Sequence, residues 1–234
     1  LAPTALAHAP MFPVSAITGD GVEALRQHLL ACAAASGSAR PHDSARAFRM
    51  PADRVFTLTG VGTVVTGSVT SGVAPVGAEL CIAPHGTGVR LRGVHAQNQP
   101  ASEARTGQRC ALALAGVAKE DVHRGDWVCA PPIALATTRI DVQCQLWPDE
   151  PKALRSGTPV HVHLGTSDVT GSIVLLDSDT LAPGATALAQ LVLHGTVAAW
   201  HGDRGVLRDA SATRTLAGVR VLDPFAPQRY RKTA

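Results

Sequence analysis

Hydrophobic and polar residues alternate in short runs along most of the chain after residue 48, as they do in half-buried β-strands. Residues 55–59 and 63–69 are two such runs, rich in Val and Thr and separated by the turn Gly60-Val61-Gly62. Further short strands, separated by Gly, Pro or Asn, are expected at residues 79–83, 89–95, 108–115 and 126–130. Short strands at this spacing predict a closed antiparallel barrel.

A second set of strands follows Pro131-Pro132, which marks a boundary because proline interrupts regular structure. These strands are expected at residues 138–147, 158–164, 170–176, 185–193, 205–208 and 216–222. They predict a second all-β domain. The last residues, with Arg229, Arg231 and Lys232, are basic and without periodicity, and we expect a tail or linker there.

The first part of the chain has a different pattern, in which residues 10–36 predict a strand, a loop and a helix. The strand is expected at residues 11–14. Asp20 is expected to cap the helix and Glu23, three residues later, to complete a capping box. One helical face is apolar, at Val22, Leu25, Leu29 and Leu30. The pattern is typical of the last piece of an α/β domain, so we expect a longer parent protein.

These patterns divide the chain into an α/β remnant, a small polar linker, two β-barrels and a tail. The fold class is therefore mainly β, with two consecutive antiparallel β-barrels preceded by a short α/β remnant. The expected bounds are 1–36, 37–45, 46–132, 133–226 and 227–234.

Composition agrees with a folded protein, since 45% of the 234 residues are hydrophobic and 17% are charged. The net charge of +3 is compatible with nucleic-acid binding but does not require it. The chain has five cysteines, an odd number, and none are spaced as CxxC, which argues against a zinc site or a disulfide framework. Free cysteines are typical of the reducing cytoplasm, where we expect this protein. No apolar run reaches the roughly 18 residues of a membrane span.

Several longer motifs resemble the translation elongation GTPases. Residues 53–67 and 115–125 are similar to the start and the closing segment of their second domain, and residues 163–171 and 207–218 resemble the third domain of elongation factor Tu. Residues 14–21 are similar to the fifth guanine-nucleotide loop. The resemblance covers nearly the whole chain in the right order.

Within that superfamily the chain most resembles the selenocysteine-specific elongation factors. The resemblance is carried by residues 92–100 and 104–109, and is supported by 124–127 and 220–225. It implies binding of selenocysteinyl-tRNA and delivery to the ribosome, and we expect a monomer. A messenger RNA hairpin would be bound only by further C-terminal domains, which this sequence does not contain.

The resemblance also implies a GTPase, with GTP and Mg²⁺ as cofactors of the full-length parent. This sequence has no GxxxxGK[ST] loop to hold phosphates and magnesium. Ser15 and Ala16 belong to the loop that touches guanine in intact GTPases. We therefore expect no bound cofactor and no GTP hydrolysis for this chain.

An aminoacyl pocket must recognise a cationic α-amino group, and the resemblance assigns this role to Asp53. The alternative is an ordinary turn aspartate that accepts backbone N–H groups. His95 is a weaker candidate for the same pocket, since a buried structural histidine is equally compatible with the sequence.

The selenol of selenocysteine is more acidic than a thiol, so its side chain is largely an anion near neutral pH. An arginine suits such an anion because it stays protonated and is weakly hydrated. Arg54 and Arg109 are the candidates, and Arg109 stands where elongation factor Tu has an uncharged Asn. Alternatively, Arg109 is a solvated residue paired with Glu103 or Asp126.

Binding of the tRNA body requires contacts to phosphates. The resemblance assigns Arg124 to the 5′ phosphate, and Arg208 and Arg214 to the region of the T stem. All three are alternatively solvated surface charges. His161 and His163 share one face of a strand, but no third ligand follows at a fixed spacing, and no metal site is predicted.

Two other functions remain open at this point. The GTPase subunit of an ATP sulfurylase shares the two barrels, but it would not need Asp53, Arg54 and Arg109 in one pocket. A general carrier or ribosome-docking barrel pair is the other alternative, and Arg109 argues against it. Composition and periodicity alone indicate two β domains and no specific activity.

Overall fold

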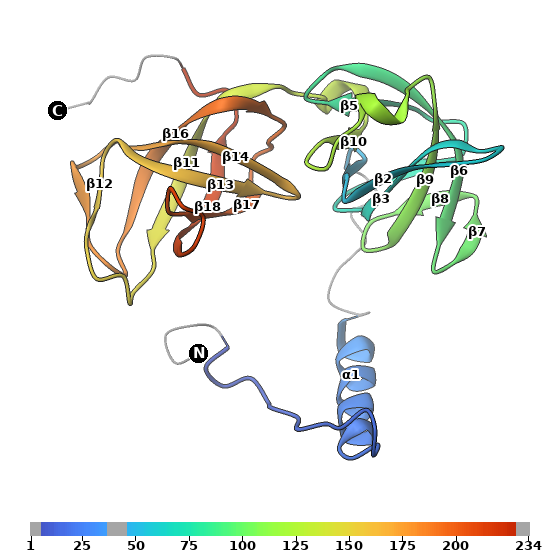
Figure 1. Ribbon diagram of the computed structural model, residues 1–234, viewed down its shortest axis with the longest axis horizontal. Coiled ribbons are helices and arrows are strands. Elements are labelled where there is room, and N and C mark those ends of the chain that lie inside the picture. The colour runs from blue at the N-terminus through green and yellow to red at the C-terminus, as the bar shows by residue number, and fades with distance from the viewer. Residues whose placement is uncertain (1–5, 37–45, 228–234) are drawn as a thin grey trace. The chain divides into compact units, whose positions relative to one another are not determined.

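The computed structural model describes residues 6–36 and 46–227, and Figure 1 shows the helix and strands within each of these parts. The chain separates into two compact units, Leu1–Asp43 and Ser44–Ala234. The predicted linker at 37–45 and nearly all of the predicted tail at 227–234 lie outside the described residues. No helix in the described parts is long and apolar enough to cross a membrane.

The first unit contains one helix, α1 (Val22–Ser36), preceded by a loop. The strand predicted at residues 11–14 is wrong, because these residues are irregular and pair with no strand in the described part of the unit. A tight turn leads into the helix, in which the Ser15 N–H donates to the Asp20 carbonyl at 3.0 Å. Gly21 must be a glycine, since it has a φ of +70° and a Cβ there would lie 2.1 Å from the Pro13 oxygen.

The predicted helix start is correct in position, but the hydrogen bonds differ from a capping box. The Asp20 carboxylate accepts from the Thr18 hydroxyl at 2.7 Å. The Glu23 carboxylate accepts from Arg26 and Gln27, one turn further along the helix. Both acids thus bond to nearby side chains. The predicted apolar face is largely open, with Leu29 57% exposed.

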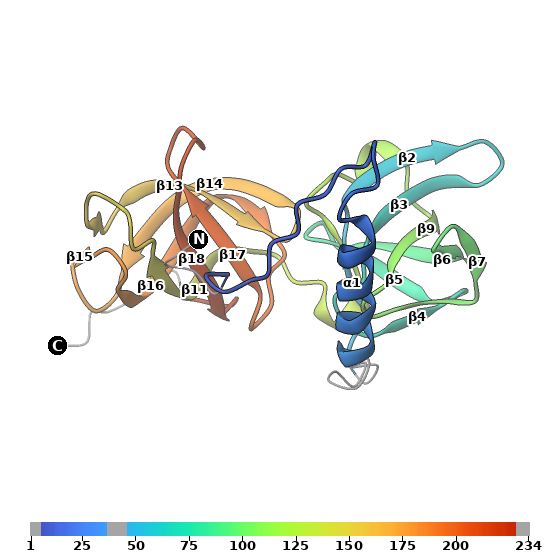
Figure 2. The same ribbon diagram turned by 90° about the horizontal axis from the view of Figure 1, so that it is seen from below.

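The first barrel domain is a sheet with the order β1-β10-β5-β6-β9-β3-β2, to which β7 is added beside β6. Figure 2 shows these strands from a second side. Its strands are β1 (Arg49–Pro51), β2 (Arg54–Leu58), β3 (Gly62–Ser68), β5 (Glu79–Ala83), β6 (Thr87–Ala96), β7 (Gln99–Ala101), β9 (Arg109–Ala115) and β10 (Trp127–Cys129). A separate pair consists of β4 (Val73–Pro75) and β8 (Glu103–Arg105).

The edge strands of this sheet, β1 and β2, are not paired with each other by strand hydrogen bonds. They are consecutive in the chain, however, and only Ala52 and Asp53 lie between them. The Ala52 N–H donates to the Asp126 carbonyl and the Asp53 N–H to the Thr66 carbonyl, each at 2.8 Å. By strand pairing the first domain is therefore an open half-barrel and not the closed barrel that was expected, and Ala52 and Asp53 form the seam that links its two edge strands.

The second barrel domain closes fully by strand pairing, in the order β11-β16-β14-β13-β17-β18 and back to β11. Its strands are β11 (Thr137–Leu146), β13 (Thr158–Leu164), β14 (Ser167–Leu175), β16 (Thr186–Val197), β17 (Arg204–Arg208) and β18 (Thr215–Asp223). A small pair, β12 (Leu154–Arg155) and β15 (Thr180–Leu181), lies beside it. Short 3₁₀ turns at η1 (Lys119–Asp121) and η2 (Pro131–Ile133) precede and follow β10.

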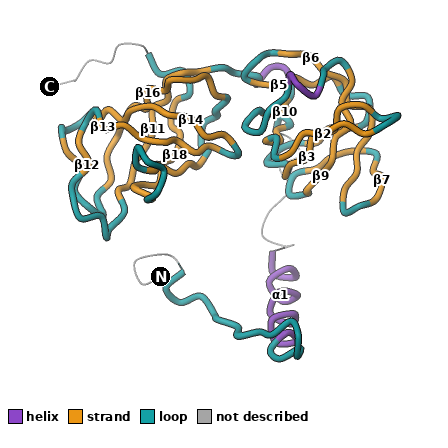
Figure 3. Tube along the Cα trace, in the orientation of Figure 1, coloured by secondary structure: helices purple, strands orange, loops and turns teal. Residues whose placement is uncertain are grey.

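The mainly β class with two antiparallel barrel domains is confirmed, and Figure 3 shows the strands that dominate both. Each barrel is filled by the inward-facing side of its alternating strands. The first core contains Val65, Leu91 and Leu112, and the second contains Ile140, Val162 and Leu191, all fully buried. Because aromatic residues make up 3% of the chain, these aliphatic side chains provide most of the hydrophobic stabilisation.

The two barrels touch through specific contacts. The Thr166 hydroxyl donates to the Ala52 carbonyl at 2.7 Å. Gly165 leaves room for the indole of Trp127, since a Cβ there would lie 2.8 Å from Trp127 Cζ2. The Arg49 guanidinium lies 4.1 Å from the centre of the same ring and binds Asp203 of the second barrel.

Candidate functional site

Asp53 and Arg109 form an ion pair on the first barrel, with Arg109 Nη2 donating to Asp53 Oδ2 at 2.7 Å. Asp53 lies in the seam before β2, and Arg109 is the first residue of β9. Both elements flank β3, in which Thr66 lies opposite Arg54 and Ser68 lies opposite Arg109. The side chains are 29% and 55% exposed, so the pair is open to solvent and to a ligand.

The pKa of the Asp53 carboxyl is lowered from its ordinary value, chiefly by the hydrogen bond from Arg109. The positive charges of Arg109, Arg124 and Arg54 lower it further. Asp53 is therefore a carboxylate at neutral pH in a positively charged neighbourhood. The partners suggested as alternatives for Arg109 are not the ones it has, because Glu103 pairs with Arg105 and Asp126 faces His85.

Arg109 and His95 line one small cavity of about 340 Å³. The wall includes Thr66, whose hydroxyl oxygen is buried and has no hydrogen-bond partner. The other lining residues are Gln97, Asn98, Gly107, Gln108, Cys110 and Ala111. His95 is exposed on β6, so the alternative of a buried structural histidine is wrong.

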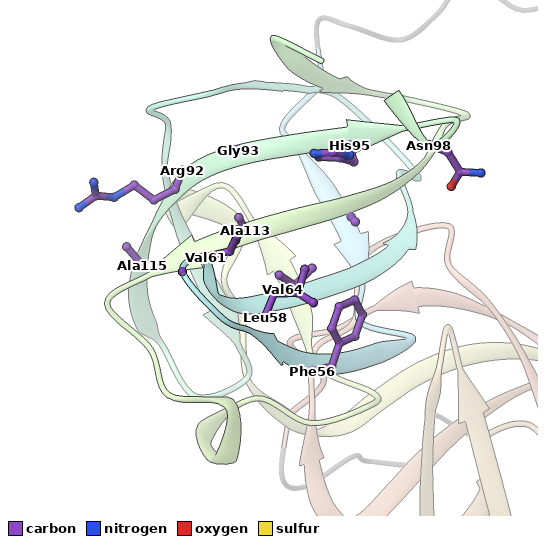
Figure 4. A pocket seen from close by; sticks show the side chains of 12 residues that line it. Phe56, Leu58, Val61, Val64, Arg92, Gly93, His95, Asn98, Ala113 and Ala115 are labelled. Carbon is purple, nitrogen blue, oxygen red and sulfur yellow. The ribbon is translucent and has the colours of Figure 1, made fainter. Parts of the chain in front are cut away.

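A larger cavity of about 920 Å³ shares His95, Asn98 and Ala111 with the first, and Figure 4 shows it from close by. Its wall is largely apolar, with Phe56 and Leu58 from β2 and Val61 from the turn that follows. Gly93, Ala113 and Ala115 leave space along the wall because their side chains are small or absent. Arg92 lies at one end of the labelled residues and Asn98 at the other.

Neither Asp53 nor Arg54 lines these cavities. Asp53 is bonded directly to Arg109, which lines the smaller one, whereas Arg54 is exposed on β2. Arg54 affects the site through its charge, which contributes to the lowered pKa of Asp53. Of the four residues predicted for the pocket, Arg109 and His95 line the smaller cavity, and Asp53 lies beside it through its bond to Arg109.

Sequence reasoning missed Thr66 and Asn98. Thr66 belongs to an alternating strand, and the pattern does not distinguish a hydroxyl that faces a cavity from one on an ordinary surface. Asn98 and Gln97 have positive φ values of 61° and 53° and form the two-residue turn between β6 and β7. A Gln-Asn pair between two strands is a signal for such a turn, because Asn tolerates this conformation.

The three arginines proposed for the tRNA body differ in their surroundings. Arg124 is exposed in the turn before β10, and its charge acts on Asp53. Arg208, on β17, donates to the Thr213 carbonyl at 3.3 Å, while its Nε is buried without a partner. Arg214 pairs with Glu150 at 3.2 Å and with Asp209 at 3.7 Å.

Ser15 and Ala16 lie in the loop that precedes α1. The Ser15 hydroxyl oxygen accepts from the Thr18 N–H at 3.2 Å, which holds the loop compact. Ala16 is exposed. The sequence offers no second loop that could hold phosphates, so these residues alone do not fit a complete nucleotide site.

Comparison with known proteins identifies the relatives of this chain. A family model described as selenocysteine-specific elongation factor, beta-barrel domain, matches residues 137–228, and one described as elongation factor Tu domain 2 matches residues 62–129. The selenocysteine-specific elongation factors of Escherichia coli and Desulfomicrobium baculatum are 40% and 36% identical to it, over 97% and 96% of the chain. The chain belongs to the selenocysteine-specific elongation factor family.

The chain spans 34% of the length of the Escherichia coli relative and 35% of the Desulfomicrobium one. Translation elongation factor SelB from Methanococcus maripaludis, solved in its apo form, has the same fold, with a TM-score of 0.81 and 23% identity. That likeness covers 95% of this chain and 52% of the archaeal one.

The relatives favour a selenocysteine-specific elongation factor over the two alternatives that the sequence left open, an ATP sulfurylase subunit and a general carrier. Neither an ATP sulfurylase subunit nor a general carrier accounts as well for relatives that match almost the full chain under one name. The individual roles of the site residues and the domain bounds remain predictions.

Proposed function

We propose that the two barrels bind selenocysteinyl-tRNA and deliver it to the ribosome under control of the GTPase domain of the full-length protein. The observation that carries this proposal is the Asp53–Arg109 ion pair beside the cavity that also contains His95. GTP and Mg²⁺ belong to the full-length parent, since this chain has only the Ser15–Ala16 loop. The proposal places the protein in the cytoplasm, as a monomer.

The ion pair matches the two charges of a selenocysteinyl ester. The ester carries a cationic α-amino group, for which Asp53 is a partner, and an anionic selenolate, for which Arg109 is a partner. A half-exposed ion pair contributes only about 0–1 kcal/mol, so opening it costs little. The ligand then replaces one ion pair by two, and both protein charges stay neutralised.

Two further groups of the small cavity suit the same ligand. The Thr66 hydroxyl has no partner, and leaving such a buried group unsatisfied costs about 1–3 kcal/mol. A polar atom of the aminoacyl group would satisfy it. His95 is exposed at the border of both cavities, where its ring can donate or stack. Seryl esters lack the anion, so they gain nothing from Arg109.

The apolar cavity suits the terminal nucleoside of a tRNA. The base of an adenosine is flat and aromatic, and stacking a base on apolar or aromatic groups contributes about 1–3 kcal/mol. Phe56, Leu58 and Val61 offer such a surface next to His95. A nucleoside bound there lies beside the cavity of Arg109, as the ester linkage between its ribose and the amino acid requires.

The tRNA body then meets the exposed cations. Arg124 is suited to a phosphate near the aminoacyl end, since its charge acts on Asp53. We assign Arg208 and Arg214 to phosphates of the T stem. Arg214 already has two carboxylate partners, so a phosphate must compete with Glu150 and Asp209. Arg214 therefore contributes less than Arg124.

Equilibrium binding of selenocysteinyl-tRNA and seryl-tRNA with the same body tests the proposal at low salt. We expect wild type to prefer the selenocysteinyl form, and Arg109→Asn to lose about 10–100-fold of that preference, as expected for one charge-assisted hydrogen bond. Arg90→Asn is the matched control, because Arg90 is an exposed arginine of the same sheet, paired with Glu79 and outside both cavities.

Equal binding of both tRNAs, unchanged in Arg109→Asn, would leave only a general tRNA-binding barrel pair. If this chain binds neither tRNA, the same comparison is made with the full-length protein and a GTP analogue. A full-length protein without the preference would overturn the proposal.

A further inference from the structure

Three metal-ligating side chains converge at the start of β10, outside the two cavities described above. They are His85, His123 and Asp126, and one ligand atom from each lies within 4.8 Å of the other two. His85 Nε2 lies 3.4 Å from Asp126 Oδ1, and His123 Nδ1 lies 3.9 Å from Asp126 Oδ2. Nothing in the proposed tRNA site uses these groups.

The sheet topology brings His85 to Asp126. Strands β5 and β10 are antiparallel, and Ala83 at the end of β5 lies opposite Trp127 at the start of β10. The residues after Ala83 and the residue before Trp127 therefore meet at the same edge. His85 follows Ala83 by two positions, in a tight turn closed by the Gly86 N–H, which donates to the Ile82 carbonyl at 2.8 Å.

A second turn adds His123. The Asp126 N–H donates to the His123 carbonyl at 3.2 Å, and the His123 N–H donates to Asp126 Oδ2 at 2.7 Å. These backbone bonds fix the carboxylate and the start of the histidine side chain without involving either imidazole ring. The following Trp127 is buried, so the carboxylate is attached to a rigid strand.

The Asp126 carboxylate is buried but makes only long contacts with the two histidine rings. The Asp126 side chain is 8% exposed, whereas those of His85 and His123 are 52% and 68% exposed. A buried carboxylate requires partners to offset its lost hydration. The separations of 3.4 and 3.9 Å from the two ring nitrogens are longer than good hydrogen bonds, so the rings approach the carboxylate without bonding well to it.

We infer that His85, His123 and Asp126 form a binding site for a divalent transition-metal ion, with zinc as the ion that fits best. Two imidazoles and one carboxylate are a ligand set that Zn²⁺ accepts, at about 2.0–2.2 Å from each ligand atom. Tetrahedral geometry then separates neighbouring ligand atoms by roughly 3.4 Å. His85 and Asp126 already have this spacing, and the exposed His123 ring, at 3.9 Å from Asp126, must move closer to reach it.

The choice of ion follows from the donor atoms. Calcium and magnesium prefer shells of oxygen atoms, and two imidazole nitrogens do not suit them. Nickel, cobalt and copper also accept imidazole, which makes cobalt a useful spectroscopic probe. Three protein ligands leave a fourth position for water. The bound ion would join the turn at residues 84–87 to the turn that carries Arg124, between His123 and Asp126.

Titration with Co²⁺, followed by the visible absorption of tetrahedral cobalt, tests the site directly, and calorimetry with Zn²⁺ measures affinity. We expect one equivalent to bind, and His85→Ala and His123→Ala each to weaken binding at least about tenfold, since even loss of outer-shell groups has that effect. Both substitutions are at exposed positions, so the fold should persist. Asp126 is left unchanged because it is buried.

The double variant His161→Ala/His163→Ala is the matched control, because it removes the other pair of neighbouring histidines. All titrations are repeated with Cys32→Ser, since Cys32 Sγ lies 3.5 Å from His28 Nε2 and that pair also attracts soft metals. Unchanged binding in the control double variant supports the site. Absence of the cobalt bands, or equal binding in wild type and both single histidine variants, would overturn it.

Discussion

Arg49 in β1 of the first barrel and Asp203 before β17 of the second are joined by two parallel hydrogen bonds of 2.8 Å each. The Arg49 side chain is 9% exposed and also stacks on Trp127, so its charge depends on Asp203 for compensation. Removing one partner of a buried ion pair leaves the other charge unpaired, which is more costly than removing both.

We therefore expect Arg49→Met to lower the free energy of unfolding by about 3–5 kcal/mol. Urea unfolding followed by tryptophan fluorescence measures this, because Trp127 and Trp200 both adjoin the pair. The double variant Arg49→Met/Asp203→Leu should recover most of the loss. A double variant that is as unstable as the sum of its single variants would contradict the explanation.

Gly67 should not tolerate a side chain. A Cβ there would lie 2.1 Å from the Pro51 carbonyl oxygen, where β3 crosses close to β1. Gly67→Ala must push the strands apart beside the Asp53 seam, and we expect a loss of about 1–3 kcal/mol or more. Gly88 in β6 is the control, since nothing lies within 4 Å of a Cβ there, and thermal unfolding of Gly88→Ala should match wild type closely.

Thr66 and Thr63, on the same strand, should respond in opposite ways to valine. The Thr63 hydroxyl donates to the Val117 carbonyl at 3.0 Å, and its loss leaves a partly buried acceptor unpaired, which costs about 1 kcal/mol. The Thr66 hydroxyl has no partner, so Thr66→Val should leave stability unchanged or raise it. If the proposed ligand bonds to Thr66, only Thr66→Val should weaken selenocysteinyl-tRNA binding without unfolding the protein.

Stability at acid pH should depend on Asp209. Backbone N–H groups of Arg214 and Thr213 lower the pKa of its carboxyl to about 2, against about 3.9 in an unfolded chain. A lowered folded pKa stabilises the protein above the unfolded value, and this contribution is lost as the pH falls from about 4 to about 2. Asp209→Asn should flatten the stability profile in that window; an unchanged slope between pH 4 and 2 would refute the assignment.

The longer strands could be predicted from the sequence because their hydrophobic and polar residues alternate. Runs at 79–83 and 158–164 coincide with β5 and β13, and most other long strands differ by one to four residues at an end. Strands of two or three residues, such as β1 and β12, were not predicted because they are too short to show a period; β10, expected at 126–130, is the exception. The apolar run at 11–14 failed as a strand for a related reason, since strand formation requires a partner and not only suitable residues.

The site was predicted less completely. The resemblance brought attention to Asp53 and Arg109, but their mutual pairing depends on how β9 lies beside β3, which local sequence does not specify. The same limit applies to Arg54, which does not bond to Arg109 although it follows Asp53 directly. His85 and Asp126 illustrate it further, because their proximity comes from the register of β5 and β10 rather than from any spacing along the chain.

The seam of the first barrel has a mechanical consequence. Only Ala52 and Asp53 connect the edge strands β1 and β2. If β2 separated from β3, Asp53 would therefore move away from Arg109. A ligand held by both residues would link the start of β2 to β9 across β3 and so oppose this separation. Binding of such a ligand is then linked to the stability of the first barrel. With the ligand bound, β2 should separate from β3 less readily than without it.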